Sequence, residues 1–169
     1  MRSHWLIALL LLPSVALGFD FKGIAIGAPA TPEQVQEKLG VRCGAGADGK
    51  QVCNGNVTIA QERSYMILVI SAQGVVQRIF LSLSPEAFDI VAPLLLEKFG
   101  PAASTSRSQV QNRMGAKFDQ VIHLWKDEQE NQVFYSRYSG TVDKSVLSFT
   151  TKEDRGMLNK NRGNPKSDI

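Results

Sequence analysis

The chain has 169 residues and a formal net charge of +3, with 43% hydrophobic and 21% charged residues. A chain of this length forms one domain or two small fused units. The near-neutral charge argues against nucleic acid as a partner, because a nucleic-acid-binding domain concentrates basic side chains on one face.

The first 18 residues have the features of a secretory signal peptide. Arg2 gives a positive start, residues 5–12 are apolar, and the small residues Ala16 and Gly18 precede a cleavage site. An apolar run of this length is too short for a membrane span, which takes about 20 residues. No later segment is long and apolar enough to span a bilayer. We therefore predict cleavage after Gly18 and a location in the periplasm or outside the cell.

A first helix is predicted at 31–39. Thr31 begins a capping box, with proline at the first helical position, and Gly40 ends the helix. A second helix, at 85–99, has Ser84 as its cap and ends before Gly100. Pro93 lies inside the second helix, where it removes a backbone hydrogen bond and should kink the chain.

Cys43 and Cys53 are the only cysteines in the sequence. In an exported chain an even count predicts a disulfide, here closing a loop worth about 2.8 kcal/mol in the chain-entropy model. A redox pair has two intervening residues, whereas nine intervene here. A metal site needs more ligands, and His123 is the only histidine beyond the signal. The glycine pattern at 44–49 resembles a dinucleotide fingerprint, but it follows a helix and lies inside the disulfide loop, so we predict no nucleotide site.

Apolar and polar residues alternate in several segments that are separated by short turns, and this pattern predicts strands. The predicted strands are 56–63, 65–72, 75–83, 107–112, 117–126, 132–138 and 145–151. In the strand 75–83, Ile79, Leu81 and Leu83 form one apolar face. The sequence therefore predicts an α+β fold, in which two helices cover one face of an antiparallel sheet.

A weak internal repeat relates the two helices. The first helix begins with the sequence TPE and ends with EKLG, and the second begins with SPE and ends with EKFG. Three or four predicted strands follow each helix. The pattern indicates a tandem α-β-β-β repeat within one domain at 19–151, with units at 19–83 and 84–151; chance similarity at helix ends is the alternative. The polar segment 152–169, which contains two glycines, three asparagines and a proline, predicts a disordered tail.

This order of elements resembles the secreted β-lactamase-inhibitor protein family. The common features are an exported chain, a helix followed by the short 43–53 disulfide loop and strands, and then a second helix with more strands. Small periplasmic proteins of proteobacteria share the plan, and the resemblance covers about residues 21–151. It implies protein binding through a sheet face and no catalysis.

Few residues could carry chemistry of their own. His123 lies on a predicted strand, where a lone histidine is usually packed or merely exposed. Asp127, Glu128 and Glu130 lie together in a predicted turn, where carboxylates are usually solvated. We predict no catalytic residue, no metal and no cofactor.

Arginine and aromatic side chains offer a binding surface instead, because these residue types are enriched among the anchors of protein interfaces. In the predicted register they share the sheet face that the helices leave uncovered. The alternative is that a loop or a chain terminus covers them as a second small core. The candidate binding residues are Arg78, Phe80, His123, Trp125, Tyr135 and Arg137.

The sequence thus predicts an exported, non-catalytic protein-binding module, such as an inhibitor of a hydrolase. Its partner would be another exported or envelope protein. One alternative is a structural accessory of envelope assembly, which should co-purify with outer-membrane complexes. A third reading is a small hydrolase that uses His123.

Overall fold

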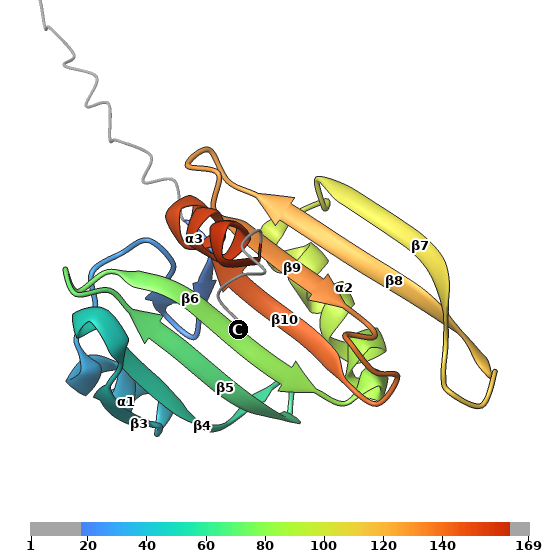
Figure 1. Ribbon diagram of the computed structural model, residues 1–169, viewed down its shortest axis with the longest axis horizontal. Helices are drawn as coiled ribbons and strands as arrows, with labels where there is room; N and C mark the ends of the chain where they lie inside the picture. The colour runs from blue at the N-terminus through green and yellow to red at the C-terminus, as the bar shows by residue number, and fades with distance from the viewer. Residues whose placement is uncertain (1–17, 163–169) are drawn as a thin grey trace, which may run out of the picture.

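The computed structural model describes residues 18–162 (Figure 1). Apart from Gly18, the predicted signal peptide lies outside this range, as do residues 163–169. The helices and strands are β1 (Asp20–Phe21), β2 (Ile24–Ala25), α1 (Pro32–Leu39), β3 (Arg42–Ala45), β4 (Gln51–Ile59), β5 (Glu62–Ile70), β6 (Val76–Leu83), α2 (Phe88–Phe99), β7 (Ser104–Gln111), β8 (Lys117–Lys126), β9 (Gln132–Ser136), β10 (Ser145–Thr150) and α3 (Lys152–Arg162).

Eight strands form one antiparallel sheet, in the order β3-β4-β5-β6-β10-β9-β8-β7. The strands β1 and β2 form a separate two-stranded hairpin. In Figure 1, α2 lies behind the sheet and α3 lies in front of it. The predicted α+β fold with an antiparallel sheet is confirmed.

The sheet order divides the fold into two halves of the same plan. One half is α1 followed by β3 to β6, and the other is α2 followed by β7 to β10. The halves meet at their last strands: Leu83 of β6 lies opposite Ser145 of β10, and Arg78 lies opposite Thr150. Each half has four strands in the sheet, one more than the predicted α-β-β-β unit, and the tandem repeat itself stays a prediction.

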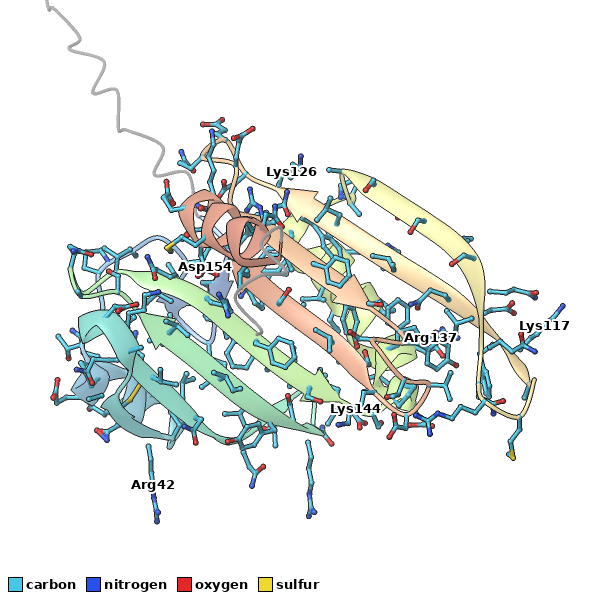
Figure 2. All side chains as sticks on the ribbon, viewed as in Figure 1. Arg42, Lys117, Lys126, Arg137, Lys144 and Asp154 are labelled. Atoms are coloured by element: carbon cyan, nitrogen blue, oxygen red, sulfur yellow. A yellow bond between two sulfur atoms is a disulfide. The ribbon has the colours of Figure 1, made fainter. Side chains whose placement is uncertain are left out.

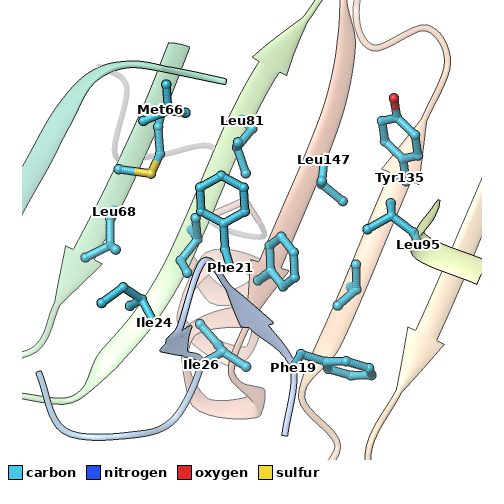
Figure 3. Packing of buried hydrophobic residues seen from close by; sticks show 14 of the residues in the cluster. Phe19, Phe21, Ile24, Ile26, Met66, Leu68, Leu81, Leu95, Tyr135 and Leu147 are labelled. Carbon is cyan, nitrogen blue, oxygen red and sulfur yellow. The ribbon is translucent and has the colours of Figure 1, made fainter. Parts of the chain in front are cut away.

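One hydrophobic core lies between the sheet and the layer formed by α1, α2 and the β1–β2 hairpin. Figure 3 shows Phe21 and Ile24 of the hairpin beside the inward side chains Leu68, Leu81 and Leu147. These three leucines are fully buried. Burying each leucine stabilises the fold by about 1.5–3 kcal/mol.

The ends of α1 are those that the sequence predicts. The Thr31 hydroxyl accepts from the backbone N–H of Gln34, and the Gln34 side chain accepts from the backbone N–H of Thr31. Gly40 ends the helix in the left-handed region at φ 66°, a conformation that costs glycine little. Val35 and Leu39 place α1 on the core.

The start of α2 differs from the prediction. A 3-10 turn at Pro85–Ala87 precedes the helix, and the Ser84 side chain caps no backbone group. The helix then continues through Pro93, whose side chain is exposed. The tight turn replaces the predicted cap because its own backbone bonds, such as Ala87 N–H to Ser84 C=O, already bond the first amides.

Cys43 and Cys53 form the predicted disulfide. They lie directly opposite each other on β3 and β4, and the Cys53 side chain is fully buried. A disulfide is typical of an oxidising compartment. Among residues 18–162 there is no helix with the length and apolar character needed to cross a membrane.

The predicted disorder is wrong for residues 152–162, which form α3. The Thr151 hydroxyl accepts from the Asp154 backbone N–H and so caps the helix. The buried Asp154 carboxylate, labelled in Figure 2, then accepts from Nε and Nη2 of Arg78 on β6, at 2.7 and 2.8 Å. This bidentate ion pair attaches α3 to the sheet, although the composition of α3 alone predicts disorder.

Replacing Asp154 should loosen α3. We expect Asp154→Ala to lower the free energy of unfolding by about 1–3 kcal/mol, because it leaves the Arg78 guanidinium partly buried without its partner. Hydrogen exchange should show faster exchange of the α3 amides in this variant. The control is Glu153→Ala, which removes an exposed neighbouring carboxylate. Equal exchange in both variants would show that the ion pair does not attach α3.

Candidate functional site

The six predicted binding residues do not share one face of the sheet. Trp125 is 2% exposed, Tyr135 is 0% exposed and His123 is 9% exposed. All three side chains point to the face that α2 covers. The prediction of one open aromatic face is therefore wrong for these three residues, and the alternative of a covered core describes them.

Two interactions with α2 and its C-terminal end explain why these side chains are buried. The Trp125 indole N–H donates to the Gly100 carbonyl oxygen at 2.9 Å, just after α2. The Phe88 ring, at the start of α2, stacks on both Tyr135 and His123, with ring centroids 4.6 and 5.7 Å away. The aromatic cluster therefore holds the helix on the sheet.

Arg137 lies just after β9 and also contacts α2. Its guanidinium forms an ion pair with Asp89 and lies 4.9 Å from the centre of the Phe88 ring. The Arg137 side chain is 23% exposed. It borders the aromatic cluster and fixes the first turn of α2, so its contacts are those of a structural residue.

The prediction placed the side chains of β8 and β9 on the wrong face of the sheet because both faces of β8 are apolar. Val121 and Trp125 point to the core, whereas Ile122 and Leu124 point to the other face. Period-two alternation identifies two faces but does not say which one a helix covers. That choice depends on where α2 lies after the chain has folded.

The uncovered face carries a different set of side chains in one straight line across the sheet. Each member lies directly opposite the next on the neighbouring strand. All are partly exposed, and four of the five are apolar. We call this set the open-face row: Ile67, Phe80, Ser148, Phe134 and Leu124.

The centre of the open-face row combines two large side chains with a small one. The small side chain of Ser148 lies between Phe80 on β6 and Phe134 on β9. On the neighbouring line across the sheet, Tyr65 is 46% exposed and its hydroxyl donates to the Asn54 side chain. The row therefore has a small polar residue between two aromatic rings.

Helix α3 borders this face at one end. Arg78, which holds α3 through Asp154, lies on the same face of β6 as Phe80, two residues away. Of the six predicted binding residues, Arg78 and Phe80 therefore lie on the uncovered face. Phe134 and Leu124 alternate along their strands with Tyr135, His123 and Trp125, so the prediction of an open face at those residues left them out, and it also left out Ile67. Apolar residues on the second face of these strands were the signal in the sequence for the row.

His123 lacks the surroundings of a catalytic base. Its Nδ1 lies 2.9 Å from the Thr105 hydroxyl, and no carboxylate of residues 18–162 is hydrogen-bonded to its ring. Burial, aided by the positive charge of Arg107, lowers the pKa of the imidazole. Among the described residues no three His, Cys, Asp or Glu side chains are close enough together to hold a metal ion.

The lowered pKa of His123 should make stability depend on pH. Because the folded protein binds this proton less readily than the unfolded chain does, stability should be full above pH 6.5, the ordinary value for histidine, and should fall as the pH decreases below it. Denaturant unfolding between pH 7 and about 5.5 should show this loss. His123→Gln should flatten the curve in that range; a wild-type curve equally flat would contradict the expectation.

Comparison of the chain with family models, with curated proteins and with solved structures gave no match in any of the three.

Proposed function

We propose that this protein is an exported, non-catalytic binding module that contacts a partner protein through the open-face row. The observation that carries the proposal is the continuous line of partly exposed apolar side chains across the uncovered face. Phenylalanine and other aromatic residues are enriched in interface cores. Among the described residues, α3 covers the end of this face near Arg78, and the row beside it stays partly exposed and open to such contact.

The chemistry of the row indicates the kind of partner. Phe80 and Phe134 provide large apolar surfaces, with the smaller side chain of Ser148 between them. The polar groups of Tyr65 and Asn54 lie at the rim, as in the polar border of a typical interface. This favours a folded exported protein, such as a hydrolase that the module inhibits, with an apolar surface at the centre of the contact.

Affinity capture from the native exported fraction tests the proposal. The wild-type protein should retain a partner that the double variant Phe80→Ala/Phe134→Ala does not retain. Both changes remove partly exposed rings, so the variant should remain folded, which circular dichroism checks. Ile90→Ala serves as the control, because Ile90 is 47% exposed on α2, behind the sheet. A partner retained equally by the double variant would refute the proposal.

A second candidate function is a structural accessory of envelope assembly. One observation favours it: Ile90, Leu94 and Leu96 on α2 are each at least 37% exposed, so the molecule has apolar side chains on two opposite sides. A scaffold that joins two proteins needs two such surfaces. Recovery of an outer-membrane complex, lost with Ile90→Ala as well as with the double variant, would favour the accessory over the inhibitor.

A further inference from the structure

Within the described part of the chain, strand β7 is a free edge of the eight-stranded sheet (Figure 1). It pairs with β8 over all eight residues without a shift in register. Every residue of β7 is exposed except Val110, which is partly exposed. The strand contains no proline or glycine, and Arg107 is its one charged residue.

The backbone groups that face the free edge can be identified from neighbouring hydrogen bonds. Asn112 N–H donates to the Ala116 carbonyl oxygen, so this opposed pair is hydrogen-bonded. Bonded and non-bonded pairs alternate in an antiparallel ladder, which makes the β7 residues with even numbers the ones bonded to β8. The residues whose N–H and C=O groups point to the free edge are Thr105, Arg107, Gln109 and Gln111.

An independent bond on the other side of β8 gives the same assignment. Arg137 N–H donates to the Val121 carbonyl oxygen, so odd-numbered residues of β8 bond to β9. The even-numbered residues of β8 therefore bond to β7, and they lie opposite the even-numbered residues of β7. Both hydrogen bonds therefore identify the same four residues of β7 as those whose backbone groups point to the free edge.

Proteins usually protect such an edge, because a row of free N–H and C=O groups pairs with another chain. The opposite edge strand, β3, has only four residues and carries a disulfide to β4. Strand β7 has neither of these features, and no bulge or proline interrupts it. Its free edge is suited to the addition of a further strand.

We propose that β7 pairs antiparallel with β7 of a second copy of this chain. The outward residues must lie opposite outward residues to form bonded pairs. A two-fold axis at Ser108 meets this condition and pairs all four of them. Thr105 then lies opposite Gln111 of the second copy, and Arg107 lies opposite Gln109 of the second copy.

Charge favours this register over its neighbour. A two-fold axis at Arg107 would place the two guanidinium groups opposite each other, and like charges in that position are destabilising. With the axis at Ser108, Arg107 of the second copy lies beside Gln109, whose side-chain amide donates to Asp119 on β8. The guanidinium of Arg107 from the second copy and the Asp119 carboxylate then lie on either side of Gln109, on the same face of the sheet.

The pairing would join two sheets without using the open-face row. Residues opposite each other in a ladder point to the same face, so the open-face rows of both copies would lie on one side of the joined sheet. The inference is independent of the proposed function, since a dimer can form whether or not the open-face row binds a partner.

Sedimentation velocity of the purified protein over a wide concentration series tests the proposal. The wild type should form a dimer, and Gln109→Pro should weaken association by about tenfold or more, because proline removes an outward N–H from each copy. Gln109→Ala is the matched control, since it keeps the N–H and should dimerise like the wild type. A wild type that stays monomeric throughout would overturn the proposal.

A second variant separates loss of pairing from loss of folding. Arg107→Glu places a carboxylate on the line that leads to Asp119, and it should also weaken the dimer while leaving the circular dichroism spectrum unchanged. Hydrogen exchange should show the Arg107 and Gln109 amides protected in the dimer and unprotected in dilute monomer. A dimer that neither Gln109→Pro nor Arg107→Glu weakens would place the interface elsewhere and overturn the proposal.

Discussion

Trp125→Ala should lower the free energy of unfolding by about 3–5 kcal/mol, among the largest effects of any single substitution in this chain. The indole is 2% exposed, contacts Phe99 of α2 edge to face, and donates its N–H to Gly100. Truncation would leave a cavity between the sheet and the end of α2, together with an unpaired carbonyl group. Thermal melting should show a fall of about 10 °C or more.

A matched variant separates the ring from its hydrogen bond. Trp125→Phe keeps an aromatic ring in the same place and loses the N–H, so its cost should be clearly smaller than that of Trp125→Ala. If Trp125→Ala melted within about 2 °C of the wild type, the indole would not be part of the core and the register of β8 would be wrong.

Removal of the disulfide should have the second-largest effect. The double variant Cys43→Ala/Cys53→Ala should lose about 2–3 kcal/mol of stability, because the unfolded chain gains the freedom of the opened loop. The buried side of this bond packs in the main core, where Cys53 is fully buried. Denaturant unfolding of the wild type with and without a reductant measures the same quantity.

The Cys43→Ala/Cys53→Ala variant also supplies the control for the measurement with a reductant. A reductant should destabilise the wild type and leave the double variant unchanged. If the wild type and the double variant unfolded at the same denaturant concentration, the disulfide would contribute nothing to the stability of this edge of the sheet.

Local signals in the sequence predict most of the fold. Thr31 and Gly40 identify α1 because the capping groups are adjacent in sequence and need no tertiary partner. The strand at Lys117–Lys126 is predicted with its observed ends. The β1–β2 hairpin is missed because two-residue strands are too short to show alternation, although Phe21 and Ile24 are buried.

The face that carries the open-face row is harder to predict than the strands that form it. Trp125 and Leu124 are adjacent, both are apolar, and the choice of which one faces α2 is made by a helix that lies 20 or more residues earlier in the sequence. Helix α3 is missed for a related reason, since its attachment depends on the distant Arg78. Interactions between residues far apart in sequence leave no periodic signal.

The affinity of Phe134→Ala for the captured partner tests the central claim most directly. Titration calorimetry with that partner should show a loss of about 2 kcal/mol or more, the size expected of an interface anchor. The melting temperature of the variant should fall by no more than about 4 °C. Unchanged affinity for Phe134→Ala, or a loss that appears with Ile90→Ala instead, would contradict a binding role for the open-face row.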